Sequence, residues 1–420
     1  MAKYFSRIAD NLLTSMLKRK SAVQIKGPKW CGKTETAKQQ ASSILYMQDP
    51  DTYTRNMATA QLKPSLLLEG DNPRLIDEWQ VAPVLWDAVR FAVDKDNTKG
   101  RFILTGSAVP GEKPLHSGTG RFAFLRMRPM SLFESRESSA EVSLKNLFDG
   151  ISEVSGTAAL ELEDMVHALV RGGWPEAVIS QDRESALSTV ADYIHAVCTE
   201  DISRSDEVSR NPEKVFGLLR SYARCSASQA ADTVLQHDMV STGQSISLPT
   251  LSSYLDALTD IFVVENLSAW HPLLRSKTVI RTSPTRHFVD PSIAVAALGA
   301  NQASLLRDPE TLGLLFESLC IRDLRIYCEA LGGSVFHYRD RAGFEADAVL
   351  TLPDGRWGLV EVKLSSIAAQ QAADNLVKLA ERIDQTNLGE PSFLMVVTAG
   401  DHAITLPNGV HIVPLSCMAP

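Results

Sequence analysis

The chain has 420 residues, with 42 Lys and Arg against 50 Asp and Glu, so its formal net charge is -8. This length predicts about two to four domains, and 44% hydrophobic with 22% charged residues excludes a disordered chain. No apolar run approaches the roughly 18 residues of a membrane span, and Arg7, Asp10 and Asn11 interrupt the N-terminal apolar stretch. The six cysteines are scattered, and none forms a CxxC pair. We therefore expect a cytoplasmic protein without a membrane span or a zinc site of that kind. The acidic total argues against a histone-like coating protein, but it leaves room for a local basic patch.

Strands alternate with helices in the N-terminal part of the chain. Residues 5–17 place apolar side chains on one helical face, and 22–25 read as a short buried strand. A helical segment begins near Glu35, and 84–93 form another helix. Further strands are expected at 65–68, 74–77, 101–105 and 122–127. This alternation predicts a parallel sheet covered on both faces.

The pattern becomes helical after about residue 155 and mixed again near the end. Helices are expected at 160–170 and 183–202, and residues 212–300 read as helices followed by a strand pair. A helix at 312–330 precedes strands at 334–338, 346–351 and 358–363. A turn at Asp354-Gly355 joins the last two strands.

A complete phosphate-loop pattern, Gly27-x-x-x-x-Gly32-Lys33-Thr34, follows the first strand. Its glycines let backbone N–H groups surround phosphates, Lys33 would reach the β- and γ-phosphates, and Thr34 would hold Mg²⁺. The alternative is a simple Gly-rich turn, which the strand before it and the helix after it disfavour. The predicted nucleotide site comprises Gly27, Pro28, Lys29, Trp30, Cys31, Gly32, Lys33, Thr34 and Glu35.

Two acidic residues end the strand at 74–77. Asp77 would bind Mg²⁺ through water, and Glu78 would polarise the water that attacks the γ-phosphate. On the next strand, Thr105 or Ser107 suits a sensor beside that phosphate, although a polar strand end is the alternative. Arg121 is a candidate finger for the nucleotide of a neighbouring subunit, with an ordinary surface arginine as the alternative.

These motifs, in this order, resemble prokaryotic AAA+-type ATPases that carry a C-terminal domain of unknown function. Further markers are Pro129-Met130-Ser131-Leu132-Phe133-Glu134, Gly172-Gly173-Trp174-Pro175-Glu176 and Glu200-Asp201-Ile202; Trp79 departs from the aliphatic residue usual there. The resemblance implies an α/β fold with a P-loop AAA+-like parallel sheet, a helical lid, a winged-helix-like segment and a C-terminal restriction-endonuclease-like α/β domain. We place these parts at residues 1–155, 156–205, 206–300 and 301–420.

A second set of acids lies near the C-terminus. Asp347 is on one strand, and Glu361 and Lys363 share a face of the next because side chains alternate with a period of two. With Glu317 from the preceding helix, the set resembles the PD-(D/E)xK nuclease arrangement, in which acids hold Mg²⁺ and the lysine steadies a hydroxide. Glu345 shares the strand face of Asp347, which is preferred only on the family pattern. The alternative is a scaffold that binds without cleaving.

A basic stretch, 273–287, contains Arg275, Lys277, Arg281 and Arg286 and no acid. It follows a helix near Pro249 and an apolar strand at 261–264, as in a winged helix with a basic wing. Such a patch would contact DNA phosphates, and a solvated hairpin or an intramolecular partner of acidic groups is the alternative.

The sequence thus predicts an Mg-dependent ATPase that couples ATP hydrolysis to conformational change, acts on or with DNA and forms a homo-oligomer. The alternative is an ATP-dependent regulatory or protein-binding module whose nuclease-like domain is inactive. A toxin or defence component is neither supported nor excluded.

Overall fold

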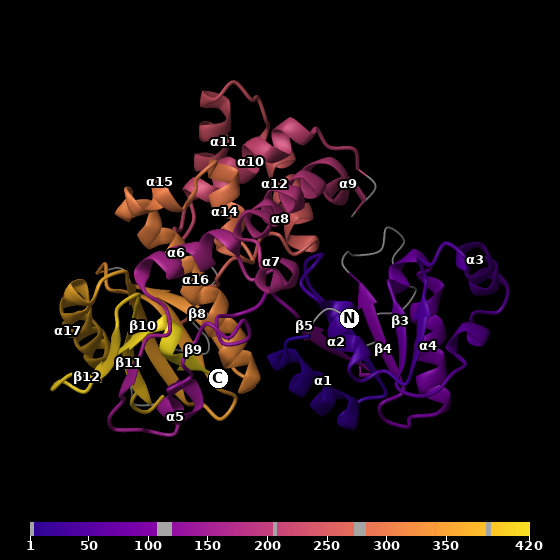
Figure 1. Cartoon of the computed structure of the whole chain (residues 1–420), viewed down its shortest axis with the longest axis horizontal. Helices are drawn as coiled ribbons and strands as arrows, with labels where there is room; N and C mark the ends of the chain where they lie inside the picture. Colours follow the sequence, from indigo (N-terminus) through magenta and orange to yellow (C-terminus); the bar gives the residue numbers. More distant parts are fainter. Residues whose placement is uncertain (1–3, 107–119, 205–207, 273–282, 341, 384–387) are drawn as a thin grey trace. The chain divides into compact units, whose positions relative to one another are not determined.

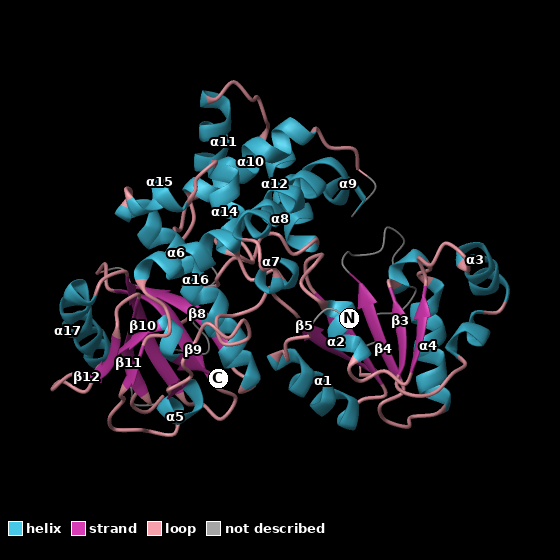
Figure 2. Ribbon diagram, viewed as in Figure 1, coloured by secondary structure: helices cyan, strands magenta, loops and turns pink. Residues whose placement is uncertain are grey.

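The computed structural model describes residues 4–106, 120–204, 208–272, 283–340, 342–383 and 388–420. The chain forms two compact units. Figures 1 and 2 show its helices and strands. Unit 1 comprises Met1–Pro129, Ala196–Asn211 and Leu255–Val263, and unit 2 comprises Met130–His195, Pro212–Tyr254 and Val264–Pro420.

Unit 1 is an α/β layer structure. Its elements are α1 Ile8–Arg19, β1 Ala22–Lys26, α2 Lys33–Lys38, β2 Ser43–Tyr46, α3 Tyr53–Leu62, η1 Pro64–Leu68, β3 Arg74–Asp77, η2 Trp79–Val81, α4 Val84–Lys95, β4 Phe102–Gly106 and β5 Phe122–Arg126, with η3 Val197–Asp201 and α9 Ile202–Arg204 added from later in the chain.

The five strands of unit 1 are parallel and follow the order β2-β3-β4-β1-β5. β4 therefore lies between β1, which leads into the phosphate loop, and β3, which ends in Asp77. β1 and β4 are almost wholly buried, as expected for central strands of a parallel sheet covered on both faces. The expected parallel α/β arrangement of this part is confirmed.

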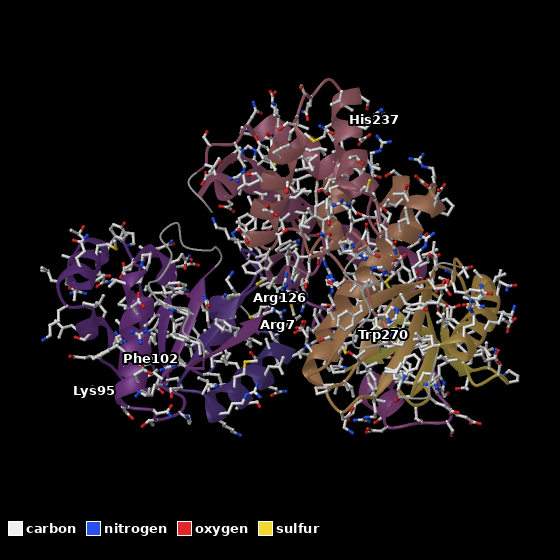
Figure 3. All side chains as sticks on the ribbon, turned by 180° about the vertical axis from the view of Figure 1, so that it is seen from behind. Arg7, Lys95, Phe102, Arg126, His237 and Trp270 are labelled. Atoms are coloured by element: carbon white, nitrogen blue, oxygen red, sulfur yellow. The ribbon has the colours of Figure 1, made fainter. Side chains whose placement is uncertain are left out.

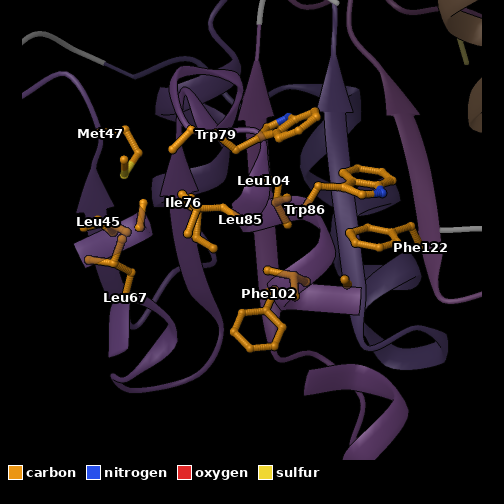
Figure 4. Close-up of a cluster of buried hydrophobic side chains, with 14 of the residues drawn as sticks. Leu45, Met47, Leu67, Ile76, Trp79, Leu85, Trp86, Phe102, Leu104 and Phe122 are labelled. Carbon is orange, nitrogen blue, oxygen red and sulfur yellow. The ribbon is translucent and has the colours of Figure 1, made fainter. Parts of the chain in front are cut away.

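Aromatic side chains fill the core between the sheet and α4. Trp86 of α4 stacks on Phe122 of β5 with ring centroids 4.0 Å apart, and Trp79 lies 5.0 Å from Trp86 (Figure 4). Leu85, Leu104 and other buried apolar residues complete this cluster. The packing fixes the start of α4 and the turn η2 directly behind Asp77 and Glu78.

Two local expectations in unit 1 are wrong. Residues 65–68 form the 3-10 turn η1 instead of a strand, because Pro64 lacks an N–H and favours the first turn of a helix. The edge strand β2, which follows the end of α2 at Lys38, is absent from the sequence prediction. Its exposed face carries Ile44 and Tyr46, which are apolar or aromatic instead of polar. The apolar–polar alternation of a half-buried strand is therefore weak in this segment.

Unit 2 combines helices with a second sheet. Its elements are β6 Val142–Ser143, α5 Leu144–Phe148, β7 Gly156–Thr157, α6 Leu162–Arg171, α7 Pro175–Ile179, α8 Arg183–Ala196, α10 Pro212–Arg224, α11 Asp232–Ser241, α12 Leu248–Asp260, α14 Pro291–Leu298, α15 Gln302–Leu306, α16 Pro309–Ala330, β8 Ser334–Arg339, β9 Glu345–Thr351, β10 Trp357–Lys363, α17 Ser366–Arg382, β11 Phe393–Thr398, β12 His402–Thr405, β13 His411–Pro414, η4 Leu415–Cys417 and β14 Met418–Ala419; the last residue of α8 and the C-terminal half of α12 belong to unit 1.

The second sheet is mixed and has the order β7-β12-β13-β11-β10-β9-β8. Strands β10, β11 and β13 are parallel neighbours, whereas β8, β9 and β10 form an antiparallel meander. The apolar face of α17 packs on this sheet, and Trp357 and Trp270 stack at its margin with centroids 5.2 Å apart. Trp270 is labelled in Figure 3.

The division of the chain by contacts differs from the expected division at several places. Ala196–Asn211 and Leu255–Val263, expected in the helical lid and the winged-helix-like part, belong to unit 1. Residues 130–155 were placed at the end of the ATPase part, but they belong to unit 2. There β6 pairs with β14 at the C-terminal end of the chain, and the N–H of Leu132 donates to Asp323 Oδ2 at 2.8 Å. The four-part division remains a prediction in its other boundaries.

The region expected to be winged-helix-like contains α10, α11 and α12. The expected strand at 261–264 is wrong, because the chain turns there and Phe262 has φ 63°. Isolated antiparallel bridges join Val264 to Phe288 and Leu267 to Thr285 instead. The winged-helix assignment therefore stays a prediction. In the described residues, no helix has both the length and the apolar character to span a bilayer.

Candidate nucleotide site

The candidate site lies at the carboxyl edge of the parallel sheet of unit 1. The phosphate loop continues from β1, Thr105 stands near the end of β4, and Asp77 ends β3. The strand register places Thr105 beside Ile25 on one side and beside Asp77 on the other. Ligands of open parallel sheets bind at this edge, so the topology brings together the three motifs that the sequence separates.

The backbone of the phosphate loop requires its two glycines. Gly27 approaches the carbonyl of Met127 so closely that an added Cβ would lie 2.3 Å from that oxygen. Gly32 precedes α2 with φ 97°, a left-handed conformation that favours glycine. Trp30 also adopts positive φ, at 64°, and its side chain is 45% exposed. Strain of this kind at a non-glycine residue is common at binding sites.

The loop's own carbonyls hold the lysine at the start of α2. Lys33 is buried, and its Nζ donates to the carbonyl oxygens of Gly27 at 3.0 Å and Pro28 at 2.7 Å. The ammonium therefore points into the loop that would surround a phosphate. The side chain of Cys31, a residue of the loop, is buried. Glu35 pairs on the surface with Lys38 at 2.7 Å.

Asp77 accepts hydrogen bonds from two threonines on different elements. Its Oδ1 accepts from Thr34 Oγ1 at 2.7 Å and from Thr105 Oγ1 at 2.6 Å. A hydroxyl and a carboxylate from the two nucleotide motifs thus already meet. Both are oxygen ligands of the kind that Mg²⁺ prefers, so the residues present fit that ion.

Glu78 directly follows Asp77 and adopts a left-handed backbone conformation, with φ 54°. Burial raises the pKa of its carboxyl above the usual range, while the charge of Lys33 and a hydrogen bond from Gln80 Nε2 act in the opposite direction. The side chain of Gln80 lies against β4, because a Cβ on Gly106 would be 2.5 Å from Gln80 Oε1. Gln80 therefore contacts the candidate base, a role that the sequence did not show.

Two further residues support the phosphate loop from distant parts of the chain. Arg7, which precedes α1 and is labelled in Figure 3, donates to the carbonyls of Cys31 at 2.8 Å and Arg128 at 2.9 Å. Lys29 donates to the carboxylate of Asp201, 172 residues later. Sequence reasoning missed the role of Arg7 altogether. Asp201 stood out only as part of the Glu200-Asp201-Ile202 marker.

The remaining predicted ATPase residues lie outside this arrangement or outside the described residues. Arg121 precedes β5 at the amino edge of the sheet, about 20 Å along the strands from the chain's own phosphate loop. It is about half exposed and pairs with Asp94 at 2.7 Å. It therefore does not reach its own nucleotide site, and action on a neighbouring subunit stays a prediction. Ser107 lies outside the described residues.

In unit 2 the four predicted nuclease-like residues influence one another. Lys363 Nζ donates to Glu361 Oε1 at 2.7 Å, and Asp347 Oδ2 accepts from the N–H of Val362 at 2.7 Å. Burial raises the pKa of Glu317, and the charges of Asp347 and Glu361 raise it further. Burial also raises the pKa of Glu361 to about 8, and the charge of Asp347 adds to this effect.

The acids as placed do not form a metal site. Within the ranges that the structure describes, no group of three or more His, Cys, Asp or Glu side chains is arranged to hold a metal ion. One oxygen of Asp347 accepts a backbone hydrogen bond, and Glu361 is engaged by Lys363. The alternative acid, Glu345, lies on the surface near Arg339, 3.7 Å away. We derive no metal-dependent step from these residues.

The predicted basic patch is only partly described. Arg275, Lys277 and Arg281 lie outside the described residues. Arg286 is buried; it donates to the carbonyl of Ala230 at 2.7 Å and to Asp232 Oδ1 at 2.6 Å. Its assignment to a DNA-binding surface is wrong, because the side chain is buried and donates to an intramolecular acid and a carbonyl instead.

Comparison with protein families divides the chain into three matched regions. Residues 19–135 match an AAA domain, whereas 162–304 and 312–418 match two different domains of unknown function. With the parallel sheet and the phosphate loop, the first match supports an AAA-type P-loop nucleotide-binding domain in unit 1. The nuclease-like resemblance of the last region finds no support in these matches.

Two curated relatives align with almost the whole chain. They are the uncharacterized proteins Rv2008c of Mycobacterium tuberculosis and Mb2031c of Mycobacterium bovis. Each is 24% identical over 412 residues, which covers 97% of this chain and 83% of the relative.

Solved structures give only distant likenesses. A Walker-type ATPase of Pyrococcus abyssi is 14% identical and covers 70% of this chain and 96% of its own, with a TM-score of 0.42. RuvB of Thermotoga maritima is 17% identical and covers 61% of this chain and 88% of its own, with a TM-score of 0.28. At such scores neither likeness carries an argument about this chain.

Proposed function

We propose that unit 1 binds ATP with Mg²⁺ in the loop at residues 27–34 and hydrolyses the γ-phosphate. The observation that carries this proposal is the meeting of Thr34 and Thr105 on one oxygen of Asp77, at 2.7 Å and 2.6 Å. A Gly-rich turn without a nucleotide would not need a buried lysine, two convergent hydroxyls and a carboxylate at one sheet edge. The AAA-domain match at 19–135 supports the same reading.

Each residue has a distinct part in this reaction. The N–H groups of the loop and of the start of α2 donate hydrogen bonds to phosphate oxygens. Lys33 donates to phosphate oxygens in place of the loop carbonyls that it contacts in this structure. Mg²⁺, when bound, supplies charge neutralisation at the β- and γ-phosphates, and Thr34 and Asp77 would hold it. Glu78 accepts a proton from the attacking water, and Thr105 positions Asp77.

The test is nucleotide binding and turnover in matched variants. Lys33→Ala should lose ATP binding, whereas Glu78→Gln should keep binding and lose turnover by about 100-fold or more. Thr59→Ala is the control, because it removes an exposed helix hydroxyl that donates to the carbonyl of Arg55. Normal turnover in Glu78→Gln would contradict the proposed role of this residue.

The DNA and oligomer components of the proposal rest on the sequence. Arg275, Lys277 and Arg281 are the basic residues that remain as candidate phosphate contacts once Arg286 is assigned to Asp232. DNA that stimulates ATP turnover, with a salt dependence that weakens in a triple alanine variant, would support this part. For the oligomer, Lys33→Ala mixed with Arg121→Ala should restore turnover if Arg121 acts on a neighbouring subunit.

A second candidate, an ATP-dependent regulatory module, is favoured by the state of the C-terminal acids. Asp347 accepts a hydrogen bond from the backbone of β10, and Glu361 pairs with Lys363, so both acids have partners inside unit 2. In this reading they are part of the second sheet and cleave nothing. A nuclease assay with Mg²⁺ or Mn²⁺ separates the two, because only a catalytic site loses cleavage in Lys363→Ala.

A further inference from the structure

A buried acid from the segment Ala196–Asn211 reaches the phosphate loop. The carboxylate of Asp201 accepts a hydrogen bond from Lys29 Nζ, and the Asp201 side chain is only 8% exposed, against 38% for Lys29. A carboxylate this buried is strongly destabilising without a cationic partner. Lys29 supplies such a cationic partner from the phosphate loop.

The local structure around Asp201 is unusual. It ends η3, a π-helical turn inserted between α8 and α9, and such turns are frequent at functional sites. Arg210 donates to the carbonyl of Ile202 at 3.0 Å, and its N–H donates to Ser203 Oγ at 3.2 Å, which ties the segment back on itself. The segment thus presents Asp201 from a defined backbone position.

The connectivity gives this contact a consequence. The segment Ala196–Asn211 belongs to unit 1, but the chain before it, up to His195, and the chain after it, from Pro212, belong to unit 2. The segment that carries Asp201 is therefore joined along the chain to unit 2 at both of its ends, to α8 before it and to α10 after it.

Lys29 also influences the candidate base. The pKa of Glu78, which burial raises, is lowered in part by the positive charge of Lys29. Lys29 therefore lies within electrostatic reach of both Asp201 and Glu78. A bound triphosphate would bring several negative charges into the same region and compete with Asp201 for this ammonium.

We propose that Asp201 is a positioning residue that holds Lys29 and yields it to a nucleoside triphosphate. The segment Ala196–Asn211 thereby reports the nucleotide state of unit 1 to unit 2. This inference rests on the proposed function, because it needs a nucleotide in the loop. It adds a residue outside the nucleotide motifs, Asp201, that competes with the phosphates for the ammonium of Lys29.

The experiment measures nucleotide affinity and hydrogen exchange of the segment in the full chain. Asp201→Asn should bind a non-hydrolysable ATP analogue about 3- to 30-fold more tightly, because the competitor is gone. In the wild type the analogue should change amide exchange in peptides from 196–204, and this response should be lost in Asp201→Asn. Asp201→Glu, which keeps the charge, should retain part of both effects.

Two further variants separate competition from a general charge effect. Asp96→Asn removes an exposed carboxylate, 3.4 Å from Arg101, and should leave affinity and exchange unchanged. In a Lys29→Met background, Asp201→Asn should change affinity little, since the pair is already absent. A full affinity gain in that background would overturn the inference, because the gain would then come from lost repulsion alone.

The outcomes also separate this inference from the proposed function. If the wild type binds no nucleotide, the proposed function fails. If it binds and hydrolyses ATP while Asp201→Asn behaves like Asp96→Asn, only the inference about Asp201 is overturned. If Asp201→Asn does not fold, Lys29→Met is decisive, because it should also abolish the exchange response of the segment.

Discussion

Replacing Glu361 by Gln should change the stability of unit 2 in a pH-dependent manner. Glu361 lies on β10, its side chain is 14% exposed, and it pairs with Lys363 at 2.7 Å. Burial, followed by the charge of Asp347, raises its pKa from 4.5 to about 8. In the folded protein this carboxyl therefore keeps a proton over a range in which the unfolded chain has released it.

The sign and size of the effect follow from this difference. Stability falls as pH rises from about 4.5 to about 8, because the folded state binds more protons there. The full cost above that window is about 5 kcal/mol, at about 1.4 kcal/mol per pKa unit. Gln avoids this cost, in which the attraction of Lys363 is already included. Because a protein relaxes around a buried charge, we expect a smaller net gain of roughly 1–3 kcal/mol near pH 9. Near pH 4.5 the gain should vanish.

Thermal unfolding at several pH values measures this difference. A gain of 1–3 kcal/mol corresponds to an increase in Tm of about 2–12 °C for Glu361→Gln at high pH. Glu345→Gln is the matched control, because Glu345 is an exposed acid on β9, 55% accessible at its side chain. A pH-independent gain, or an equal gain in Glu345→Gln, would refute the reasoning. We expect Mn²⁺ to change neither Tm; a Mn²⁺-dependent rise that Glu361→Gln abolishes would restore the metal-site hypothesis.

Three further outcomes are expected. As the pH is lowered, turnover should fall at a pH above the usual glutamate range, because burial raises the pKa of Glu78. Gln80→Leu removes a hydrogen bond to the charged form of Glu78, so it should move this acidic limb of the pH–rate profile to still higher pH. An unshifted limb would exclude contact between the two residues during turnover. Arg7→Met should weaken ATP binding about 10-fold or more in a titration, because the carbonyl of Cys31 loses its donor, while a variant with normal affinity would show that the loop holds its shape without Arg7. Arg286→Met should destabilise unit 2 by about 1–3 kcal/mol in denaturant unfolding, because its bonds to Ala230 and Asp232 are lost. The salt dependence of any DNA binding should stay unchanged. A weaker salt dependence in this variant would show that Arg286 contacts DNA phosphates.

The sequence by itself determined which residue types meet at the candidate nucleotide site. The phosphate loop and the acids at 77–78 are short, local patterns whose residue types have one common use, and the flanking apolar runs indicate the strands that carry them. The regular elements with strong apolar periodicity, such as α4, β3 and α16, lie where the sequence predicts them. The sequence does not predict the edge strand β2, which exposes half of its side chains, and it predicts a strand at η1, because Leu66–Leu68 form a short apolar run although only Leu67 is buried.

Only the tertiary structure decided which distant residues meet. The insertion of β4 between β1 and β3 puts Thr105 on Asp77, and the fold brings Asp201 to Lys29 across 172 residues. It also buried Arg286 against Asp232, although its neighbours in the sequence are basic and polar. The partner of a side chain depends on topology and packing, which cannot be read from local composition or periodicity. The positive charge of an arginine therefore does not tell whether its side chain lies on the surface or is buried beside an acid.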